Sequence, residues 1–384
     1  MSKPHVFTSI NRLVQGRGAI ATLGDEVARL HASRVLLVTD PGLVSTGIPD
    51  KVAASLNGRD VSLYTEVEAD PSIETIDACA DHVRRGGFDL VIGLGGGSPI
   101  DTAKCAAALA RNEGRAEDYL GIEKISRPGL PKIIIPTTAG TGSEVTNVAV
   151  LSLKAQHTKK GIVSRHLFAD CAILDAELTV GLPASITAAT GMDALTHAIE
   201  AYVSRFAQPL TDRYALDAIR LISHNLRTAV HNGANLDARE AMLTGSLYAG
   251  LAFGSAATGM VHGLAMPLGG QFNVPHGVAN AAMLPHVMRF NLVSAVERYR
   301  DIAEAMGEVV TGCSPRRGAE LAVEAVVRLS ADIGVPTLRQ LGIPEDAIDA
   351  LAADGMTNTR QILPNPRAVT HADLVGILRE AFSK

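Results

Sequence analysis

The sequence predicts an α/β domain over residues 1–182 followed by an all-helical domain over residues 183–384. In the first half of the chain, short β-branched runs alternate with amphipathic stretches, which is typical of a parallel sheet covered by helices on both faces. In the second half the periodicity is mostly helical, as in residues 212–231 and 238–262. A Gly181-Leu182-Pro183 turn separates the two regions.

Length and composition exclude several classes of protein. The chain has 384 residues, 47% hydrophobic and 20% charged, enough for two packed cores. Lys and Arg number 35 against 40 Asp and Glu, so there is no basic surplus for binding nucleic acid. Apolar runs stop well short of the roughly 18 residues of a membrane span, and no signal core follows the first residues. We expect a cytoplasmic protein with reduced thiols and neither nucleic-acid nor membrane partners.

The predicted core strands of the α/β domain are near-continuous apolar runs, which fits strands buried on both faces. They lie at residues 34–40, 61–64, 88–93 and 132–136.

A glycine-rich turn follows the third of these strands, in residues 90–101, and opens a helix. Glycines allow the backbone to approach an anion, and the helix start offers free amides, so a pyrophosphate would fit here. The spacing is neither GxGxxG nor a Walker loop, and a purely structural turn is an equal alternative from these residues alone. Residues 16–21 do match GxGxxA, but they follow a poor strand, and we interpret them as a structural turn.

Two further features point to a nucleotide. Asp40 ends the first apolar strand, where a carboxylate would meet ribose hydroxyls and repel a 2′-phosphate. Residues 136–144 form a small, hydroxyl-rich loop after another strand, able to bond phosphate or ribose. These residues favour NAD over NADP.

Four side chains in the second half could hold a metal. Asp193 and His197 lie one helical turn apart, and His262 and His276 are each followed by glycine. One oxygen and three nitrogens suit Fe²⁺ or Zn²⁺. Each histidine taken alone fits a core or capping role better than a ligand role, and only the combination of the four residues favours a metal site. Glu200, on the same helix face, could orient a ligand or be a solvated carboxylate.

These stretches together resemble the iron-containing, group III alcohol dehydrogenase family. The resemblance extends over nearly the whole chain in the family's order. The matching stretches are Gly95-Gly96-Gly97-Ser98-Pro99-Ile100-Asp101-Thr102-Ala103-Lys104, residues 136–144, residues 190–201, Pro275-His276-Gly277-Val278-Ala279-Asn280 and Asn365-Pro366-Arg367.

The resemblance implies a Rossmann-like dinucleotide-binding domain followed by a helical metal-binding domain, an architecture of the dehydroquinate synthase-like type. It implies a divalent metal, iron first and zinc as the alternative, held in the interdomain cleft by the positions of Asp193, His197, His262 and His276. It also implies a set of residues that contact the nicotinamide cofactor: Asp40, Gly95, Gly96, Gly97, Ser98, Asp101, Thr137, Thr138 and Lys159.

The sequence departs from the family at one position near the expected reaction site. Family members often carry a second histidine four residues after the third ligand, with a proton-handling role, and here that residue is Met266. A thioether carries no proton, so water, a ribose hydroxyl or another side chain must do so. Phe253 matches a family position that lines the substrate pocket, and with Met266 it would make the pocket apolar.

The expected activity is metal-dependent hydride transfer between a small alcohol or aldehyde and NAD(H), in a homodimer or larger homo-oligomer. A polyol or hydroxyacid dehydrogenase of the same superfamily, of the glycerol, lactaldehyde, diol or hydroxybutyrate type, is the alternative. A metal-dependent hydrolase or lyase and a metal-stabilised sensor are more distant alternatives. The physiological substrate and the direction of the reaction are not readable from these residues.

Overall fold

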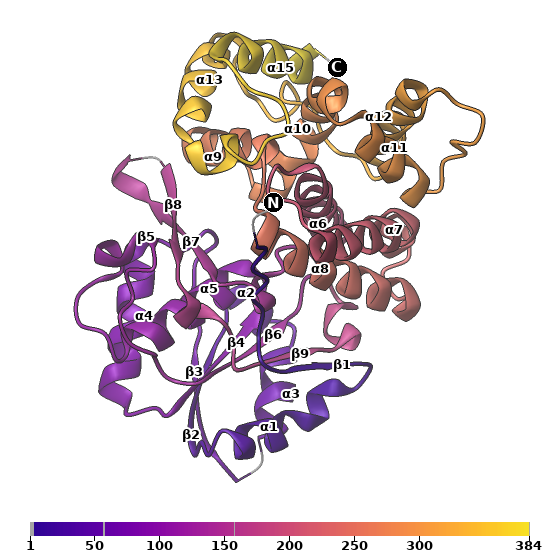
Figure 1. Cartoon of the computed structure of the whole chain (residues 1–384). Coiled ribbons are helices and arrows are strands. Elements are labelled where there is room, and N and C mark those ends of the chain that lie inside the picture. Colours follow the sequence, from indigo (N-terminus) through magenta and orange to yellow (C-terminus); the bar gives the residue numbers. More distant parts are fainter. Residues whose placement is uncertain (1–3, 57, 157, 384) are drawn as a thin grey trace. The chain divides into compact units, whose positions relative to one another are not determined.

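The computed structural model describes residues 4–56, 58–156 and 158–383 (Figure 1). The chain divides into two compact units: one runs from Ser9 to Gly181, and the other runs from Leu182 onward and includes the first residues up to Thr8. The first unit is built on a parallel sheet, and the second consists of helices. This order confirms the predicted fold class.

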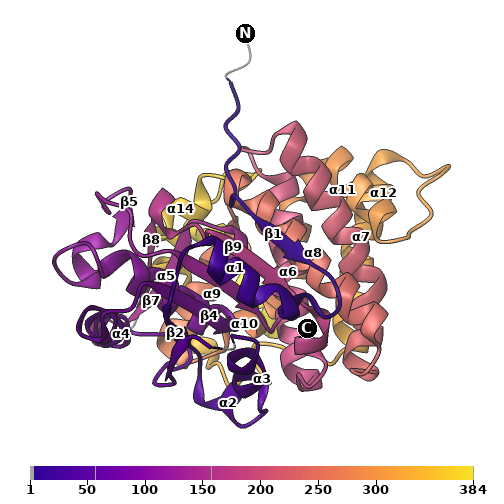
Figure 2. The ribbon, with the colours of Figure 1, turned by 90° about the horizontal axis from the view of Figure 1, so that it is seen from below.

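The α/β unit contains a six-stranded sheet in which every hydrogen-bonded pair of neighbours is parallel. Its strands, in spatial order, are β1 (Leu13–Gln15), β9 (Cys171–Leu174), β6 (Lys132–Pro136), β4 (Leu90–Gly95), β2 (Arg34–Val38) and β3 (Asp60–Tyr64). The four predicted strands are confirmed, with bounds shifted by up to two residues. β1 and β9 were not predicted; β1 is a short strand beside β9 at the sheet edge (Figure 2), and its Leu13 is exposed.

Helices cover both faces of this sheet. Side chains alternate along a strand, so Leu36 and Val38 of β2 pack with α4 and α5, whereas Val35 and Leu37 pack with α1 and α3. The helices of this unit are α1 (Leu23–Arg29), α2 (Pro41–Val44), α3 (Ile48–Ala54), α4 (Ile73–Gly86) and α5 (Gly97–Leu109).

A second, three-stranded sheet was missed by the sequence analysis. β7 (Val148–Leu153) pairs antiparallel with β8 (Thr158–Val163), and β8 pairs parallel with the short β5 (Gly121–Ile122). The sheet is only half buried, and β8 begins Thr-Lys-Lys, so it lacks the continuous apolar run by which the core strands were recognised.

Residues 16–21, which match a dinucleotide-binding pattern, form a turn bonded to the protein's own carboxylate. The backbone amides of Gly18 and Ile20 each donate to one oxygen of Asp175, both over 3.1 Å. Asp175 is completely buried and lies just after β9. The turn therefore acts structurally, joining the start of the unit to its last strand.

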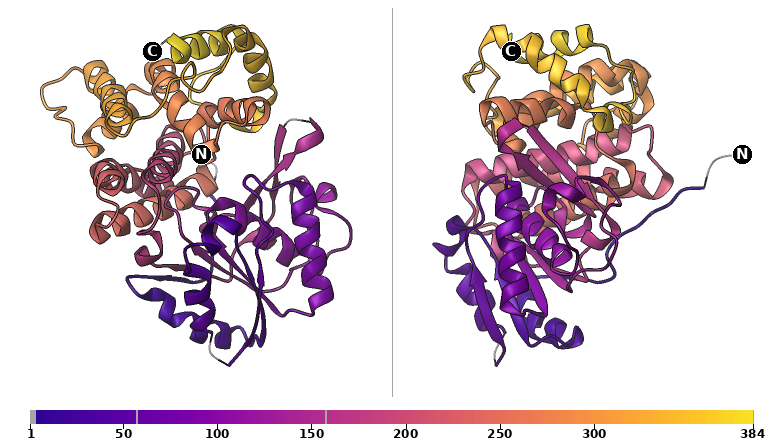
Figure 3. Two further views of the ribbon diagram at one scale, coloured as in Figure 1. Left: turned by 180° about the vertical axis from the view of Figure 1, so that it is seen from behind. Right: turned by 90° about the vertical axis from the view of Figure 1, so that its left-hand side faces the viewer.

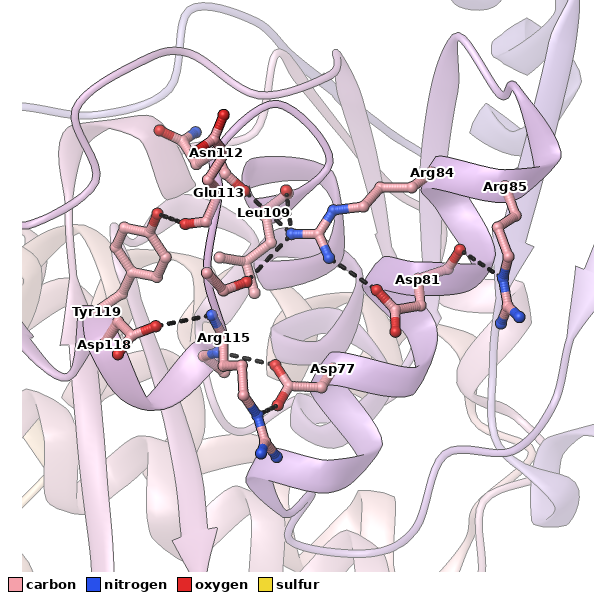
Figure 4. A network of polar contacts seen from close by, with 12 residues as sticks. Asp77, Asp81, Arg84, Arg85, Leu109, Asn112, Glu113, Arg115, Asp118 and Tyr119 are labelled. Atoms are coloured by element: carbon pink, nitrogen blue, oxygen red, sulfur yellow. Dashed lines mark hydrogen bonds and ion pairs between the residues drawn. The ribbon is translucent and has the colours of Figure 1, made fainter.

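The carboxyl-terminal end of α5 is held by an arginine of α4 (Figure 4). The Nη2 atom of Arg84 donates to the carbonyl oxygens of Leu109, Asn112 and Gly114 over 2.8, 3.0 and 3.3 Å, and Nη1 donates to Asp81 over 2.8 Å. These carbonyls lie where a helix leaves its last acceptors without intrahelical donors. We call this contact the Arg84 clamp.

The helical unit is built around α6, α7 and α8, which pack against one another (Figure 3). Its helices are α6 (Ala184–Val203), α7 (Pro209–His231), α8 (Leu236–Ala256), α9 (Met260–Phe272), α10 (His276–Asn291), α11 (Val296–Ala305), α12 (Pro315–Asp332), α13 (Ile348–Thr357), α14 (Thr359–Ile362) and α15 (His371–Ser383).

The helix predicted over residues 238–262 is wrong in one respect, because it breaks after Ala256. Ala257 has a φ of +64°, a conformation that L residues rarely adopt, and α9 starts anew at Met260. His262 consequently lies in the first turn of a helix and not at the end of one. His276 is the first residue of the next helix, α10.

No single helix among the described residues has the length and apolar character to cross a membrane. Within the part of the chain that the structure describes, one pair of helices, α8 and α9, reaches that length and composition together, and the pair is bent by 102° at the break.

Candidate active site

The predicted cofactor residues gather at one edge of the parallel sheet. The next strand of this sheet after β2 is β3, which lies beside β2 toward one edge of the sheet. The next strand of this sheet after β4 is β6, which lies beside β4 toward the opposite edge. The carboxyl ends of β2 and β4 therefore form a topological switch point, where ligands bind in open α/β sheets. Asp40 follows β2, and Gly95 to Ser98 follow β4.

The glycines of this turn are required by its geometry. Gly95 has a φ of +145°, and a Cβ there would lie 2.7 Å from Cγ of Pro99. A Cβ on Gly97 would lie 2.9 Å from Cγ2 of Thr141. The turn thus leaves no room for a side chain at Gly95 or Gly97, and it leads directly into α5, whose first amides point out of the helix start.

Asp40 lies beside the glycine turn. Its Oδ1 accepts a hydrogen bond of 2.9 Å from the amide of Leu43 and so caps α2, while Oδ2 is 3.4 Å from the position of a Cβ on Gly95. The carboxylate is therefore placed where the first strand ends, next to the turn, as a ribose-binding acid would be.

The structure brings the hydroxyl-rich loop against the same turn. The amide of Thr137 donates to the carbonyl of Gly95 over 2.9 Å, and the Thr138 side chain approaches within 3.4 Å of where a Cβ on Gly96 would be. Both predicted threonines thus adjoin the glycines.

Ser98 and Lys159 converge on Asp70. The Ser98 hydroxyl accepts a hydrogen bond of 3.1 Å from the Asp70 amide, and Lys159 Nζ lies 2.8 Å from Asp70 Oδ1. Lys159 comes from β8, so the small sheet carries this cation to the neighbourhood of the turn.

Asp101 is directed inward. Its carboxylate accepts from the Ser143 hydroxyl over 2.6 Å and from the Val150 amide over 2.8 Å. Lys104, for which we predicted no role, lies one turn later with Nζ 3.7 Å from Asp101 Oδ1 and 2.8 Å from the Ser143 hydroxyl. Burial raises the pKa of Asp101 and lowers the pKa of Lys104. Together these groups fasten α5 to the hydroxyl-rich loop.

In the helical unit, three of the four predicted metal ligands come together. Asp193 of α6, His262 of α9 and His276 of α10 each offer a donor atom, and the three atoms lie within 4.8 Å of one another. Asp193 Oδ1 is 3.8 Å from Nε2 of each histidine. Two atoms bound at about 2.1 Å to one tetrahedral ion would be about 3.4 Å apart, so the spacing suits a single ion.

His197, the fourth predicted ligand, lies one turn after Asp193 and stacks on its neighbours. Its ring centroid is 4.5 Å from that of His262 and 4.3 Å from that of Phe253, with interplanar angles of 28° and 17°. Phe253 therefore packs directly on the cluster. Met266 is half-buried on α9, one turn after His262.

The state of His262 fits a cation site. Its Nδ1 lies 2.6 Å from Glu200 Oε2, and its buried Nε2 has no hydrogen-bond partner. Since a carboxylate only accepts hydrogen bonds, Nδ1 carries a proton and Nε2 faces Asp193. A buried nitrogen without a hydrogen-bond partner lowers the stability of the folded protein. A divalent ion, for which imidazole and carboxylate are both suitable ligands, would bind this nitrogen and remove that cost.

Opposite charges within this cluster outweigh the effect of burial on the pKa values of Asp193 and His262. Burial raises the pKa of Asp193, but the imidazoles of His197, His276 and His262 outweigh it, and the net shift is downward. Burial lowers the pKa of His262, and the Glu200 carboxylate reverses this shift.

Asn280, which we did not predict as a site residue, also contributes. Its Nδ2 donates to Asp193 Oδ1 over 2.6 Å and lies 3.1 Å from His276 Nε2. The sequence signal that could have identified Asn280 is its position four residues after His276 on the same helix.

Comparisons with known proteins agree along most of the chain. Residues 11–176 match the model of the iron-containing alcohol dehydrogenases, and residues 187–382 match that of the carboxyl-terminal part of the same family. Long-chain-alcohol dehydrogenase 1 of Geobacillus thermodenitrificans is 47% identical over 96% of this chain and 94% of its own length.

Solved structures give the same result. A 1,3-propanediol oxidoreductase is 42% identical, with a TM-score of 0.96 over 99% of this chain and 100% of its own. Sulfoacetaldehyde reductase from Bifidobacterium kashiwanohense, solved in complex with NAD⁺, is 31% identical, with a TM-score of 0.91 over all of both chains. The chain is an oxidoreductase that acts on CH–OH groups, and it belongs to the iron-containing alcohol dehydrogenase family.

Proposed function

We propose that this enzyme transfers a hydride reversibly between a small primary or secondary alcohol, or a diol, and NAD⁺, with one divalent ion held by Asp193, His197, His262 and His276. The observation that carries the proposal is the approach of Asp193 Oδ1 to two imidazole Nε2 atoms at 3.8 Å. Iron is the ion that the family name indicates, and zinc accepts the same donors.

The α/β unit would bind the cofactor at the switch point. The glycine turn and the first amides of α5 would receive the pyrophosphate, while Thr137 and Thr138 add donors beside it. Asp40 would accept bonds from ribose hydroxyls and repel a 2′-phosphate, which favours NAD. Ser98 and Lys159 border this site, and Asp101 would support it from within.

The ion, when bound, supplies a Lewis acid that lowers the pKa of a hydroxyl and polarises a carbonyl. Asp193 contributes the negative charge of the ligand set, and the histidines contribute neutral nitrogens. Met266 cannot exchange a proton, so the hydroxyl proton leaves through water, a ribose hydroxyl or another side chain.

The substrate we propose is uncharged. Phe253 packs on His197 and, with Met266, would give the pocket an apolar wall. Two of the relatives above, at 47% and 42% identity, are named for long-chain alcohols and 1,3-propanediol, which supports an alcohol or diol over a hydroxyacid. The third, a sulfoacetaldehyde reductase named for a charged aldehyde, is only 31% identical. We further propose a cytoplasmic homodimer or larger homo-oligomer, with the functional domain boundary at residue 182.

The test is a panel of alcohols and aldehydes with NAD(H) and NADP(H), on protein reconstituted separately with Fe²⁺ and with Zn²⁺. We expect absorbance changes at the reduced-nicotinamide band with NAD⁺ and simple alcohols or diols, and their loss on chelation. Turnover that persists in fully metal-depleted protein would refute the proposal. A mass measurement by light scattering tests the oligomeric state.

A further inference from the structure

We propose that Glu200 is a positioning residue that holds His262 in the tautomer with its proton on Nδ1, so that Nε2 is directed to the metal. This inference rests on the proposed function, because it concerns the site assigned there to the ion.

The Glu200 carboxylate is almost completely buried, and both its oxygens are engaged. Oε2 accepts from the His262 Nδ1–H over 2.6 Å and from the Gly259 amide over 2.8 Å, and Oε1 accepts from the Val261 amide over 2.6 Å. Glu200 stands two helical turns after Asp193 on α6. One helix thus carries both a proposed ligand and the group that orients another.

The break between α8 and α9 makes this contact possible. A Cβ on Gly259 would lie 3.0 Å from Glu200 Oε1, so the close approach of backbone to carboxylate favours glycine. The carboxylate accepts from free amides at the start of α9, where negative charge is also favoured. The same side chain therefore fixes both the start of the helix and the ring that this helix carries.

A carboxylate is the group that these three donors require. It accepts at both oxygens, whereas glutamine has one acceptor oxygen and an amide that donates. If the glutamine oxygen faced Val261, its NH₂ would face His262 Nδ1, and the imidazole would have to move its proton to Nε2. A protonated Nε2 cannot bind a metal.

The charge of Glu200 is directed at this imidazole. Within the described part of the chain, His262 is the basic side chain that contacts the Glu200 carboxylate, with Nδ1 at 2.6 Å from Oε2. Behind the carboxylate lies a cavity of about 10 Å³, lined in part by Tyr299, Asn291 and Asn365. The two asparagines form a pair of hydrogen bonds, in which the Nδ2 of each donates to the Oδ1 of the other over 2.8 Å.

The experiment compares Glu200→Gln with Asn358→Ala. Asn358 Nδ2 donates to the Gly263 carbonyl over 2.8 Å, so its loss also weakens the first turns of α9 without touching His262. Each full-length variant is titrated with Co²⁺ alone, and binding is followed by the visible absorption of the ion. We expect Glu200→Gln to weaken Co²⁺ binding about 10–100-fold, as is usual for partners of metal-binding histidines, and Asn358→Ala to leave it within about twofold.

A second measurement needs no Glu200 variant. Long-range ¹H–¹⁵N spectra of the Zn²⁺-loaded wild-type protein, labelled at histidine, show which ring nitrogen carries the proton. The His262 signal is identified by its loss in His262→Asn. We expect the proton on Nδ1; a proton on Nε2 would overturn the inference.

The outcomes separate this inference from the proposed function. If folded Glu200→Gln binds Co²⁺ as tightly as wild type, the inference fails while the metal site stands. If wild type binds neither Co²⁺ nor Zn²⁺, the metal assignment fails, and spectra of the metal-free protein at high pH still decide the tautomer. If Asn358→Ala weakens binding as much as Glu200→Gln, the role of Glu200 is that of a helix cap.

Discussion

The side-chain amide of Asn280 donates a hydrogen bond to the carboxylate of Asp193 over 2.6 Å, and thereby links α10 to α6. Both side chains are buried. Because a hydrogen bond to a charged group contributes about 1.5–3 kcal/mol, we expect Asn280→Ala to lower the free energy of unfolding of the metal-free protein by about that amount.

Urea unfolding followed by circular dichroism measures this change. The matched control is Asn225→Ala, which removes a neutral bond to the Leu221 carbonyl in α7 and should cost about 1 kcal/mol. Equal losses in the two variants would contradict a special role for Asn280.

The proposed metal ligands and the proposed cofactor residues belong to different units, so their functions should separate by mutation. Asp193→Ala or His262→Ala should reduce turnover by roughly 10³-fold, since Lewis-acid stabilisation is worth several kcal/mol. Binding of NAD, followed by the fluorescence of NADH, should be unchanged. Loss of NADH binding in both variants would show that the cluster does more than hold an ion.

Asp40 should decide between the two dinucleotides. Asp40→Asn removes the charge but keeps a good N-cap for α2, so folding should be little affected. We expect the ratio of kcat/KM for NADP⁺ to that for NAD⁺ to rise about tenfold or more, because one close like-charge repulsion of at least about 1.4 kcal/mol disappears. Asp50→Asn, an exposed change in α3, is the control and should leave the ratio as it is.

Glu26 should make the α/β unit sensitive to acid. Hydrogen bonds from Arg12, against the opposing effect of burial, lower the pKa of Glu26 to about 2, and Arg29 contributes as well. A carboxyl whose pKa is lower in the folded state stabilises it above the unfolded pKa near 4.5, and this stabilisation disappears as the pH falls from about 4.5 to about 2. The stabilisation lost over this pH range is about 3 kcal/mol in the free energy of unfolding.

The test is urea unfolding at a series of pH values. Glu26→Gln should be less stable by about 3 kcal/mol at neutral pH and should lose this part of the acid dependence. Glu74→Gln, an exposed change in α4, should behave as wild type. An unchanged pH profile in Glu26→Gln would contradict the assignment.

The Arg84 clamp should stabilise the α/β unit without acting on the cofactor. Arg84→Ala removes three hydrogen bonds to carbonyls at and just after the end of α5 (Figure 4), and we expect a loss of about 1.5–3 kcal/mol in unfolding free energy. Arg85→Ala, the neighbouring residue with one weak bond to the Asp81 carbonyl at 3.3 Å, should cost less than 0.5 kcal/mol. NADH affinity should remain unchanged in both.

The sequence predicted those parts of the fold that have local signals. Buried parallel strands such as 132–136 are continuous apolar runs, and the i, i+4 spacing of Asp193 and His197 places them on one helix face whatever surrounds them. The family motifs located the glycine turn and three of the proposed metal ligands, which the structure brings together.

What was missed depends on partners far along the chain. The break at Ala257 occurs in an apolar stretch, and the amides it frees are satisfied by Glu200, about 60 residues earlier. Glu200 could be interpreted as a solvated carboxylate because nothing nearby in sequence identifies those donors. The inward direction of Asp101 likewise depends on Ser143 and Val150, which only tertiary folding brings near.

The bond from Gly18 and Ile20 to Asp175 has a consequence for reading related sequences. The sequence of this loop matches a nucleotide-binding pattern, but the anion that its amides bind is a carboxylate of the protein itself, which comes from the last part of the same unit. A pattern search that stopped at residues 16–21 would assign the coenzyme to the outermost strand β1, which β9 and β6 separate from the switch-point pair β4 and β2. In related chains, an acidic residue directly after the last strand of the sheet indicates that the amides of such a loop bind this carboxylate and not a cofactor.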